Sequence, residues 1–191
     1  MTAHPAALVI GAGVAGIEAA LVLAKEGREV HVVEKAPCVG GMANRYEEVF
    51  PAMECGSCML EPKLDQLLHK ANIHVHPYSE VEDVVGFVGN YTIQIRKKAR
   101  SVDPEACYGC DDCIKACPVQ DIPNEFNQGL DLRAAIYVPY AGSLPNAAVV
   151  DRTACLHFQG TDCGACAQAC PFGAIDLTTQ DEVIEVDVGG V

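Results

Sequence analysis

The chain has 191 residues and is strongly acidic, with 13 basic against 26 acidic residues and a formal net charge of −13. This balance excludes nucleic-acid binding as the main function, because that depends on basic surfaces. Residues 6–24 are apolar enough to suggest a membrane span, but Glu18 and three glycines interrupt them. The chain opens without the features of a secretory signal, so we expect a cytoplasmic protein with no direct membrane span.

The first predicted elements are a strand, a glycine-rich turn, a helix and a second strand. Residues 6–10 resemble a buried parallel strand, residues 17–26 have helical periodicity, and residues 28–33 form the next strand pattern. Between the first strand and the helix lies the turn Gly11-Ala12-Gly13-Val14-Ala15-Gly16. This order is typical of a dinucleotide-binding βαβ unit.

Each glycine of the turn has an expected role. Gly11 allows a tight turn, Gly13 lets a pyrophosphate approach the backbone, and Gly16 lets helix and strand pack closely. Glu34 ends the second strand, where an acidic side chain can accept a hydrogen bond from a ribose 2′-hydroxyl, which favours FAD or NAD over NADP. The alternative is that these glycines serve only the sharp turn.

A glycine pair, Gly40-Gly41, follows the second strand. It resembles the extension found in two-dinucleotide-binding flavoproteins, where the chain passes close to the flavin side of the cofactor. This favours FAD as the nucleotide. The expected cofactor-binding residues are Gly11, Ala12, Gly13, Gly16, Glu34, Lys35, Gly40 and Gly41.

Two cysteines after the glycine pair, Cys55 and Cys58, have a two-residue spacing that brings their sulfurs within reach of one another. They could form a redox dithiol, supply ligands to an iron-sulfur cluster of their own, or simply pack near a flavin. Even with Cys38, the local ligand count falls short of four. Cys38 alone is expected to be a small buried thiol.

The middle of the chain predicts a helix, a third parallel strand and a meander. His74 and His76 alternate along the third strand and face one side, either as a metal pair or as solvated side chains. Pro62 is expected in the first turn of the helix. The predicted elements are a helix over 62–70, strands over 73–76, 81–88 and 91–97, and a last strand over 182–188 that completes the meander.

Eight of the 11 cysteines form two similar runs, each ending in Cys-Pro. This is the ligand spacing of a two-cluster bacterial ferredoxin, in which the fourth cysteine of each run binds the cluster of the other run. The predicted sets are Cys107, Cys110 and Cys113 with Cys170, and Cys155, Cys163 and Cys166 with Cys117. Zinc and disulfides are weaker alternatives, since the spacing lacks paired zinc knuckles.

The order of these motifs looks like the A subunit of heterodisulfide reductase, with quinone-interacting oxidoreductase subunits as close relatives. The resemblance rests on the βαβ fingerprint, Val39-Gly40-Gly41-Met42-Ala43, Phe50-Pro51 followed by Cys55 and Cys58, Gly89-Asn90-Tyr91, Arg96-Lys97-Lys98-Ala99-Arg100, the cysteine runs, and Ala135-Ile136-Tyr137-Val138-Pro139. It implies an electron-transfer protein with FAD and two 4Fe-4S clusters, which can relay electrons or split a pair between two acceptors.

The predicted architecture is an α/β fold. A Rossmann-like FAD-binding domain with a β-meander (1–99, returning at 181–191) is interrupted by an inserted two-cluster ferredoxin domain (100–180). The expected partners are other redox subunits, including a chain that completes the flavin domain. The alternative function is a non-catalytic ferredoxin-like carrier with a vestigial nucleotide-binding fold.

Overall fold

The computed structural model describes residues 4–191, and the chain divides into two compact units. The first unit consists of Met1–Lys98 with Asp181–Val191, and the second is Ala99–Gln180. The second unit is therefore an insertion in the sequence of the first. In the part of the chain that the structure describes, no helix has the length and apolar character needed to cross a membrane.

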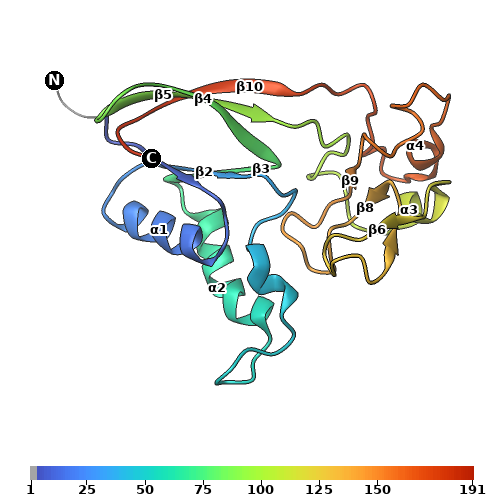
Figure 1. Ribbon diagram of the computed structural model, residues 1–191, viewed down its shortest axis with the longest axis horizontal. Helices are drawn as coiled ribbons and strands as arrows, with labels where there is room; N and C mark the ends of the chain where they lie inside the picture. Colours follow the sequence, from blue (N-terminus) through green and yellow to red (C-terminus); the bar gives the residue numbers. More distant parts are fainter. Residues whose placement is uncertain (1–3) are drawn as a thin grey trace. The chain divides into compact units, whose positions relative to one another are not determined.

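The first unit is built on a parallel sheet of three strands in the order β1-β2-β3. Figure 1 shows the helices of this unit on one side of the sheet. Val30 and Val32 are fully buried, as expected for a parallel strand covered on both faces. The elements are β1 (Ala7–Ile10), α1 (Val14–Lys25), β2 (Val30–Glu34), the 3₁₀ helix η1 (Gly41–Arg45), α2 (Gly56–His69) and β3 (Ile73–Pro77).

An antiparallel meander covers the other side of this sheet (Figure 1). Its strands are β4 (Ser79–Phe87), β5 (Asn90–Lys97) and β10 (Glu182–Val188), in the order β10-β5-β4. The strand from the end of the chain thus pairs with β5, as the alternating pattern predicts. The two layers share a core of buried side chains: Ala6, Leu8, Val33, Ile93, Ile95 and Val188.

Helix α2 begins earlier than the sequence predicts. It starts at Gly56, and Pro62 lies in its interior instead of its first turn. The reason is local, because the Sγ of Cys55 accepts a hydrogen bond of 3.3 Å from the backbone N–H of Cys58. A sulfur cap of this kind satisfies one of the free N–H groups at the helix start, a role that ordinary capping rules assign to oxygen side chains.

The second unit holds two short helices and four short strands. Its core is formed by Val102, Cys113, Ile136, Ala148, Val150, Cys166 and Ala174. Each of its four strands is only two residues long. The elements are α3 (Asp112–Ala116), β6 (Ile122–Pro123), β7 (Leu132–Arg133), β8 (Ile136–Tyr137), β9 (Val149–Val150) and α4 (Ala165–Ala169).

One buried arginine connects the strands of this unit. Nη2 of Arg133 lies 2.9 Å from Oδ2 of Asp151, and its Nε lies 2.7 Å from Oε2 of Glu125. Its guanidinium also stacks over the ring of Tyr137, 3.9 Å from the centroid. The hydrogen bond from Arg133 lowers the pKa of Glu125. Charge pairing of this kind offsets the cost of burying the cation.

Candidate functional site

The glycine-rich turn after β1 has the backbone that the fingerprint predicts. Gly11 has a φ of +98°, which side chains with a Cβ rarely adopt. A Cβ at Gly16 would overlap with the carbonyl oxygen of Gly11. Gly16 therefore lets α1 pack directly against the turn, which is the role expected of it.

Gly13 differs from these two glycines, because a Cβ there would have no heavy atom within 4 Å. Its φ of −81° and ψ of −178° are open to any residue. Nothing in the fold of the chain itself requires glycine at this position. A requirement for glycine here would come from a ligand that lies against the backbone.

Glu34 is buried, with 8% of its surface exposed. Its Oε2 accepts a hydrogen bond of 2.7 Å from the N–H of Ala12, and its Oε1 accepts one of 2.8 Å from the N–H of Ala36. The side chain thus connects the end of β2 to the glycine-rich turn. Because a carboxylate has about four lone-pair sites, it keeps the capacity to accept a hydroxyl as well.

The glycine pair Gly40-Gly41 folds back onto this turn. The N–H of Gly40 donates a hydrogen bond of 2.8 Å to the carbonyl of Ala12. A Cβ at Gly41 would lie 2.9 Å from the Cα of Gly13, so only glycine fits there without a shift. Both glycines have positive φ angles, +109° and +64°. The predicted nucleotide-binding residues of three separate segments therefore meet around one turn.

A cleft opens at the carboxyl ends of β1 and β2, with a volume of about 940 Å³ that includes space open to solvent. Gly11, Glu34 and Lys35 line it, while the other predicted residues either belong to the glycine-rich turn or, as Gly40 and Gly41 do, contact it. The sequence did not identify the wall from β4, because its alternating pattern indicates only a strand. The lining is Ile10, Gly11, Val33, Glu34, Lys35, Ser79, Glu80 and Val81.

The residues of this cleft fit a dinucleotide such as FAD. An open backbone at Gly13 and a buried acid with spare acceptor capacity at Glu34 suit a pyrophosphate and a ribose, respectively. Glu80 is held by cations, with Nζ of Lys98 at 2.6 Å and Nη2 of Arg96 at 3.2 Å. The hydrogen bond from Lys98 lowers the pKa of Glu80, so the acid stays ionised at the cleft wall.

Cys55 and Cys58 form a close pair of thiols at the start of α2. The Sγ of Cys58 donates a hydrogen bond of 2.7 Å to the Sγ of Cys55, and the Oγ of Ser57 lies 3.0 Å from the same sulfur. The hydrogen bond from Cys58, followed by that from Ser57, lowers the pKa of Cys55 to about 7, while the hydrogen bond with Cys55 raises the pKa of Cys58. Such an arrangement favours one nucleophilic thiolate beside a resolving thiol.

The predicted histidine pair has a third member that the sequence did not reveal. His31 on β2 lies beside His74 of β3 in the parallel register, and its Nδ1 is 3.1 Å from Nε2 of His76. Nε2 of His74 lies 3.0 Å from Oε1 of Glu29. Within residues 4–191, however, no three His, Cys, Asp or Glu side chains are grouped to hold a single metal ion. The metal-pair alternative therefore gains no support.

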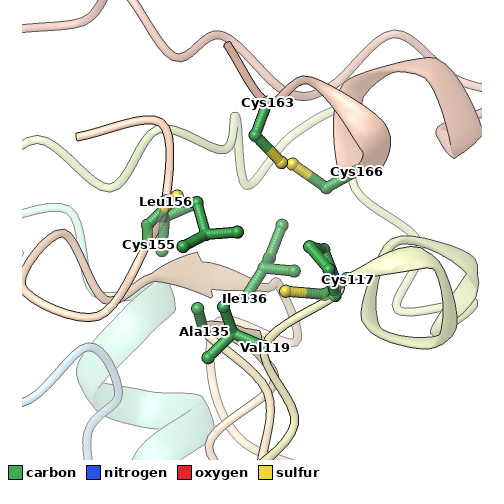
Figure 2. Close-up of a pocket in the computed structure, with 10 residues that line it drawn as sticks. Cys117, Val119, Ala135, Ile136, Cys155, Leu156, Cys163 and Cys166 are labelled. Atoms are coloured by element: carbon green, nitrogen blue, oxygen red, sulfur yellow. The ribbon is translucent and has the colours of Figure 1, made fainter. Parts of the chain in front are cut away.

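One hollow of the second unit is lined by cysteines of both runs. Cys155, Cys163 and Cys166 of the second run share it with Cys117 of the first run. Figure 2 shows the sulfurs of Cys163 and Cys166 on one wall and that of Cys117 on another. The rest of its lining is mostly aliphatic: Val119, Ala135, Ile136, Val150 and Leu156, with Pro118.

The other hollow has the reciprocal composition. Cys107, Cys110 and Cys113 of the first run share it with Cys170 of the second. Of these, Cys113 is buried and Cys110 is exposed. The structure thus brings together the two sets of four cysteines that the sequence pattern predicts, each set made from three cysteines of one run and one of the other.

The chemistry of these cysteines fits iron-sulfur clusters. All eight are free thiols, and burial, together with the neighbouring Cys107 and Cys110, raises the pKa of Cys113 to about 12. Burial raises the pKa of Cys166 as well. A buried thiol of this kind ionises readily only when a metal cation compensates the charge. A 4Fe-4S cluster takes one thiolate at each of its four irons, and each hollow supplies four cysteines.

Two known domain families match parts of this chain. Residues 9–84 match the NAD(P)-binding Rossmann-like domain, and residues 161–176 match the 4Fe-4S binding domain. The first match covers the glycine-rich turn and Glu34, and the second covers Cys163, Cys166 and Cys170. They confirm the predicted α/β fold with a Rossmann-like domain and an iron-sulfur motif.

Several curated proteins are similar over nearly the whole chain. The A subunit of the H2:CoB-CoM heterodisulfide, ferredoxin reductase of Methanothermobacter marburgensis is 38% identical over 97% of this chain and 27% of that protein. The iron-sulfur A subunit of the CoB-CoM heterodisulfide reductase of Methanocaldococcus jannaschii is 40% identical over 96% of this chain and 27% of that protein. Another iron-sulfur A subunit of such a reductase, from Methanopyrus kandleri, is 43% identical over 97% of this chain and 27% of its own length.

Proposed function

Because this chain is a relative of the A subunits of the heterodisulfide reductases, we propose that it is a flavin- and iron-sulfur-dependent electron-transfer part of an oxidoreductase complex. The chain spans about a quarter of the length of these relatives. In this proposal FAD binds in the cleft of the first unit, and two 4Fe-4S clusters bind in the two hollows of the second unit. FAD handles one or two electrons and each cluster handles one.

The observation that carries the proposal is the crossed composition of the two hollows. Each contains three cysteines of one run and the last cysteine of the other run. Disulfide pairing or two independent zinc sites would not require this exchange of ligands between the runs. The two-cluster ferredoxin arrangement does require it.

The residues of the first unit support a specific mode of FAD binding. We assign the pyrophosphate to the open backbone at Gly13 and the N-terminus of α1, and the ribose to the carboxylate of Glu34. Gly40 and Gly41, which contact the same turn, would border the path of the cofactor toward its flavin end. In this mode Gly11 and Gly16 shape the turn, and Lys35 lines the cleft.

In this proposal Cys55 and Cys58 act as a redox dithiol, which is oxidised to a disulfide and reduced again. Their sulfurs lie 2.7 Å apart, so the pair could form a disulfide by giving up two electrons and two protons, with the proposed FAD as the two-electron acceptor. The start of α2 is also bonded to the residue that follows η1, since the N–H of Gly56 donates to the carbonyl of Tyr46. Ligation of an extra cluster remains the alternative role for the pair.

The resemblance supports two further parts of the proposal. Other redox proteins would bind this chain, because its relatives are named as subunits of larger reductases, and a further polypeptide segment would complete the flavin domain. We further propose that the protein can split an electron pair between two acceptors. The competing function, a ferredoxin-like carrier with a vestigial nucleotide fold, is disfavoured by the intact turn and by Glu34.

The test is the cofactor content of anaerobically prepared protein. We expect roughly eight irons and eight sulfides per chain, with visible absorption that a reductant bleaches. Stoichiometric FAD in the same preparation, or FAD taken up on titration, supports the flavin-dependent function. Eight irons without any affinity for FAD would favour the ferredoxin-like carrier, and about four irons or bound zinc would contradict both.

A further inference from the structure

The two cysteine hollows of the second unit differ in their exposure to solvent. Of the eight cysteines in the two runs, Cys110 is exposed, whereas the other seven are buried or half-buried. Electron transfer slows steeply with distance, so the exposed corner of a cluster is where exchange with another protein is fastest. The hollow that contains Cys110 is therefore the better point of contact with a partner.

Two aromatic side chains lie beside this exposed cysteine. Tyr108 is 74% exposed and Phe172 is 49% exposed, and their ring centroids are 4.9 Å apart. Tyr108 follows the first cysteine of one run, while Phe172 follows the Cys-Pro of the other. Exposed aromatic residues are frequent anchors at protein interfaces. The hollow around Cys117 instead has half-buried aliphatic residues, Val119 and Leu156, at its wall.

Acidic side chains stand next to the aromatic pair. Asp111 lines the hollow, and Asp112 follows it as the first residue of α3; both are exposed. We call the surface formed by Tyr108, Cys110, Asp111, Asp112 and Phe172 the Cys110 face.

Lys115 is the basic residue that pairs with an acid of the Cys110 face, Asp112, and the other three bind elsewhere in the second unit. Residues 99–180 contain ten acidic and four basic residues. Arg100 donates to the carbonyls of Ala147 and Ala148, and Arg152 donates to the carbonyl of Thr179. Arg133 is buried against Glu125 and Asp151, and Lys115 lies 3.4 Å from Asp112 on the surface. The Cys110 face is thus an apolar contact with an acidic border.

We propose that the Cys110 face is the docking site for a basic one-electron carrier protein, one whose redox centre is ringed by lysine or arginine. This inference rests on the proposed function, because it requires a cluster in the hollow behind Cys110. The acidic border favours a partner with a positively charged surface and speeds its approach. The two aromatic rings supply the close contact. Complexes of this kind bury little area, which suits such a small surface.

The first measurement is binding without electron transfer. Oxidised protein is titrated with oxidised cytochrome c, a basic carrier with a lysine-ringed haem edge. We expect affinity to fall as salt is raised. The double variant Asp111→Asn/Asp112→Asn should lose about fivefold in affinity at low salt and show a weaker salt dependence. Asparagine tolerates the left-handed backbone of residue 111, where φ is +65°.

Matched controls separate the Cys110 face from the general acidity of the chain. Asp121→Asn/Asp131→Asn removes the same charge from exposed positions that do not line the hollow, and should leave binding unchanged. Tyr108→Ser should weaken binding at every salt concentration with little change in the salt slope. Leu130→Ser, at an 89% exposed position elsewhere in the unit, should have no effect.

The second measurement is electron transfer from protein reduced with stoichiometric dithionite. One electron leaves the reduced cluster and converts ferric to ferrous haem. The rate with cytochrome c should fall in the Asp111→Asn/Asp112→Asn variant, while the rate with a small uncharged benzoquinone stays near that of the parent. Equal losses in the test and control pairs, or binding that does not depend on salt, would overturn the docking site. Missing iron in the parent would instead contradict the proposed function.

Discussion

The backbone N–H of Ala12, in the turn after β1, donates a hydrogen bond of 2.7 Å to Oε2 of Glu34, the last residue of β2. Glu34 therefore has one observed role and one proposed role. It holds the glycine-rich turn in place, and it faces the cleft in which we propose that FAD binds. The fingerprint predicts the second role, and the structure adds the first.

Replacing Glu34 with glutamine should weaken both the fold and the cofactor site. Glutamine keeps one acceptor oxygen, so it can satisfy the N–H of Ala12 or that of Ala36, but its amide group then faces the other N–H. We expect a loss of about 1–3 kcal/mol in the free energy of unfolding, measured with denaturant on the FAD-free chain. FAD affinity should fall in parallel. Glu26→Gln, at an exposed position at the end of α1, is the control and should change neither quantity.

Gly13 and Gly16 should respond differently to substitution. A Cβ at Gly13 would have no heavy atom within 4 Å, so we expect Gly13→Val to fold with normal iron content but to lose FAD binding more than tenfold. Gly16→Ala should destabilise the fold itself, because its Cβ overlaps with the carbonyl of Gly11. Thermal unfolding and FAD titration of the two variants would distinguish these effects. Unchanged FAD affinity in Gly13→Val would contradict the assigned pyrophosphate position.

The crossed cysteine sets predict which cluster each variant damages. Cys117→Ser should disturb the cluster bound by Cys155, Cys163 and Cys166, and Cys170→Ser should disturb the other one. Electron paramagnetic resonance of the reduced variants can tell the clusters apart, with Cys163→Ser as the reference for the first and Cys110→Ser for the second. If the spectrum of Cys117→Ser matched that of Cys110→Ser, ligands would come from one run only.

Local sequence patterns were sufficient for the fold class, the glycine-rich turn and the meander, because each depends on periodicity and on residues with a special backbone. They did not reveal the contact of His31 with His76, which depends on the register between two parallel strands. The early start of α2 was also missed, since cysteine is not an ordinary helix cap. The cleft wall at Ser79 and Glu80 lies at the start of β4, which begins two residues before the predicted strand over 81–88.

The stability of the first unit should decrease in mild acid because of His76. Burial, followed by the charges of His31, Lys97 and His74, lowers the pKa of His76 to about 4 in the folded chain. The unfolded chain takes up a proton near the ordinary pKa of about 6.5, so stability falls as pH decreases from about 7 to 4. The effect is on the order of 2 kcal/mol, and denaturant unfolding at several pH values measures it. A His76→Gln variant should lose less stability over the same range; an equal loss would assign the effect to other groups.

The thiol pair at the start of α2 should show unequal reactivity. Hydrogen bonds from Cys58 and Ser57 lower the pKa of Cys55 to about 7, while the hydrogen bond with Cys55 raises the pKa of Cys58. At pH 7 iodoacetamide should therefore modify Cys55 well before Cys58, as mass spectrometry of the reduced protein would detect. Ser57→Ala should shift the reaction of Cys55 to higher pH, because one hydrogen bond to its thiolate is removed. Complete protection of both thiols, with more iron than two clusters contain, would show instead that Cys55 and Cys58 bind an extra cluster.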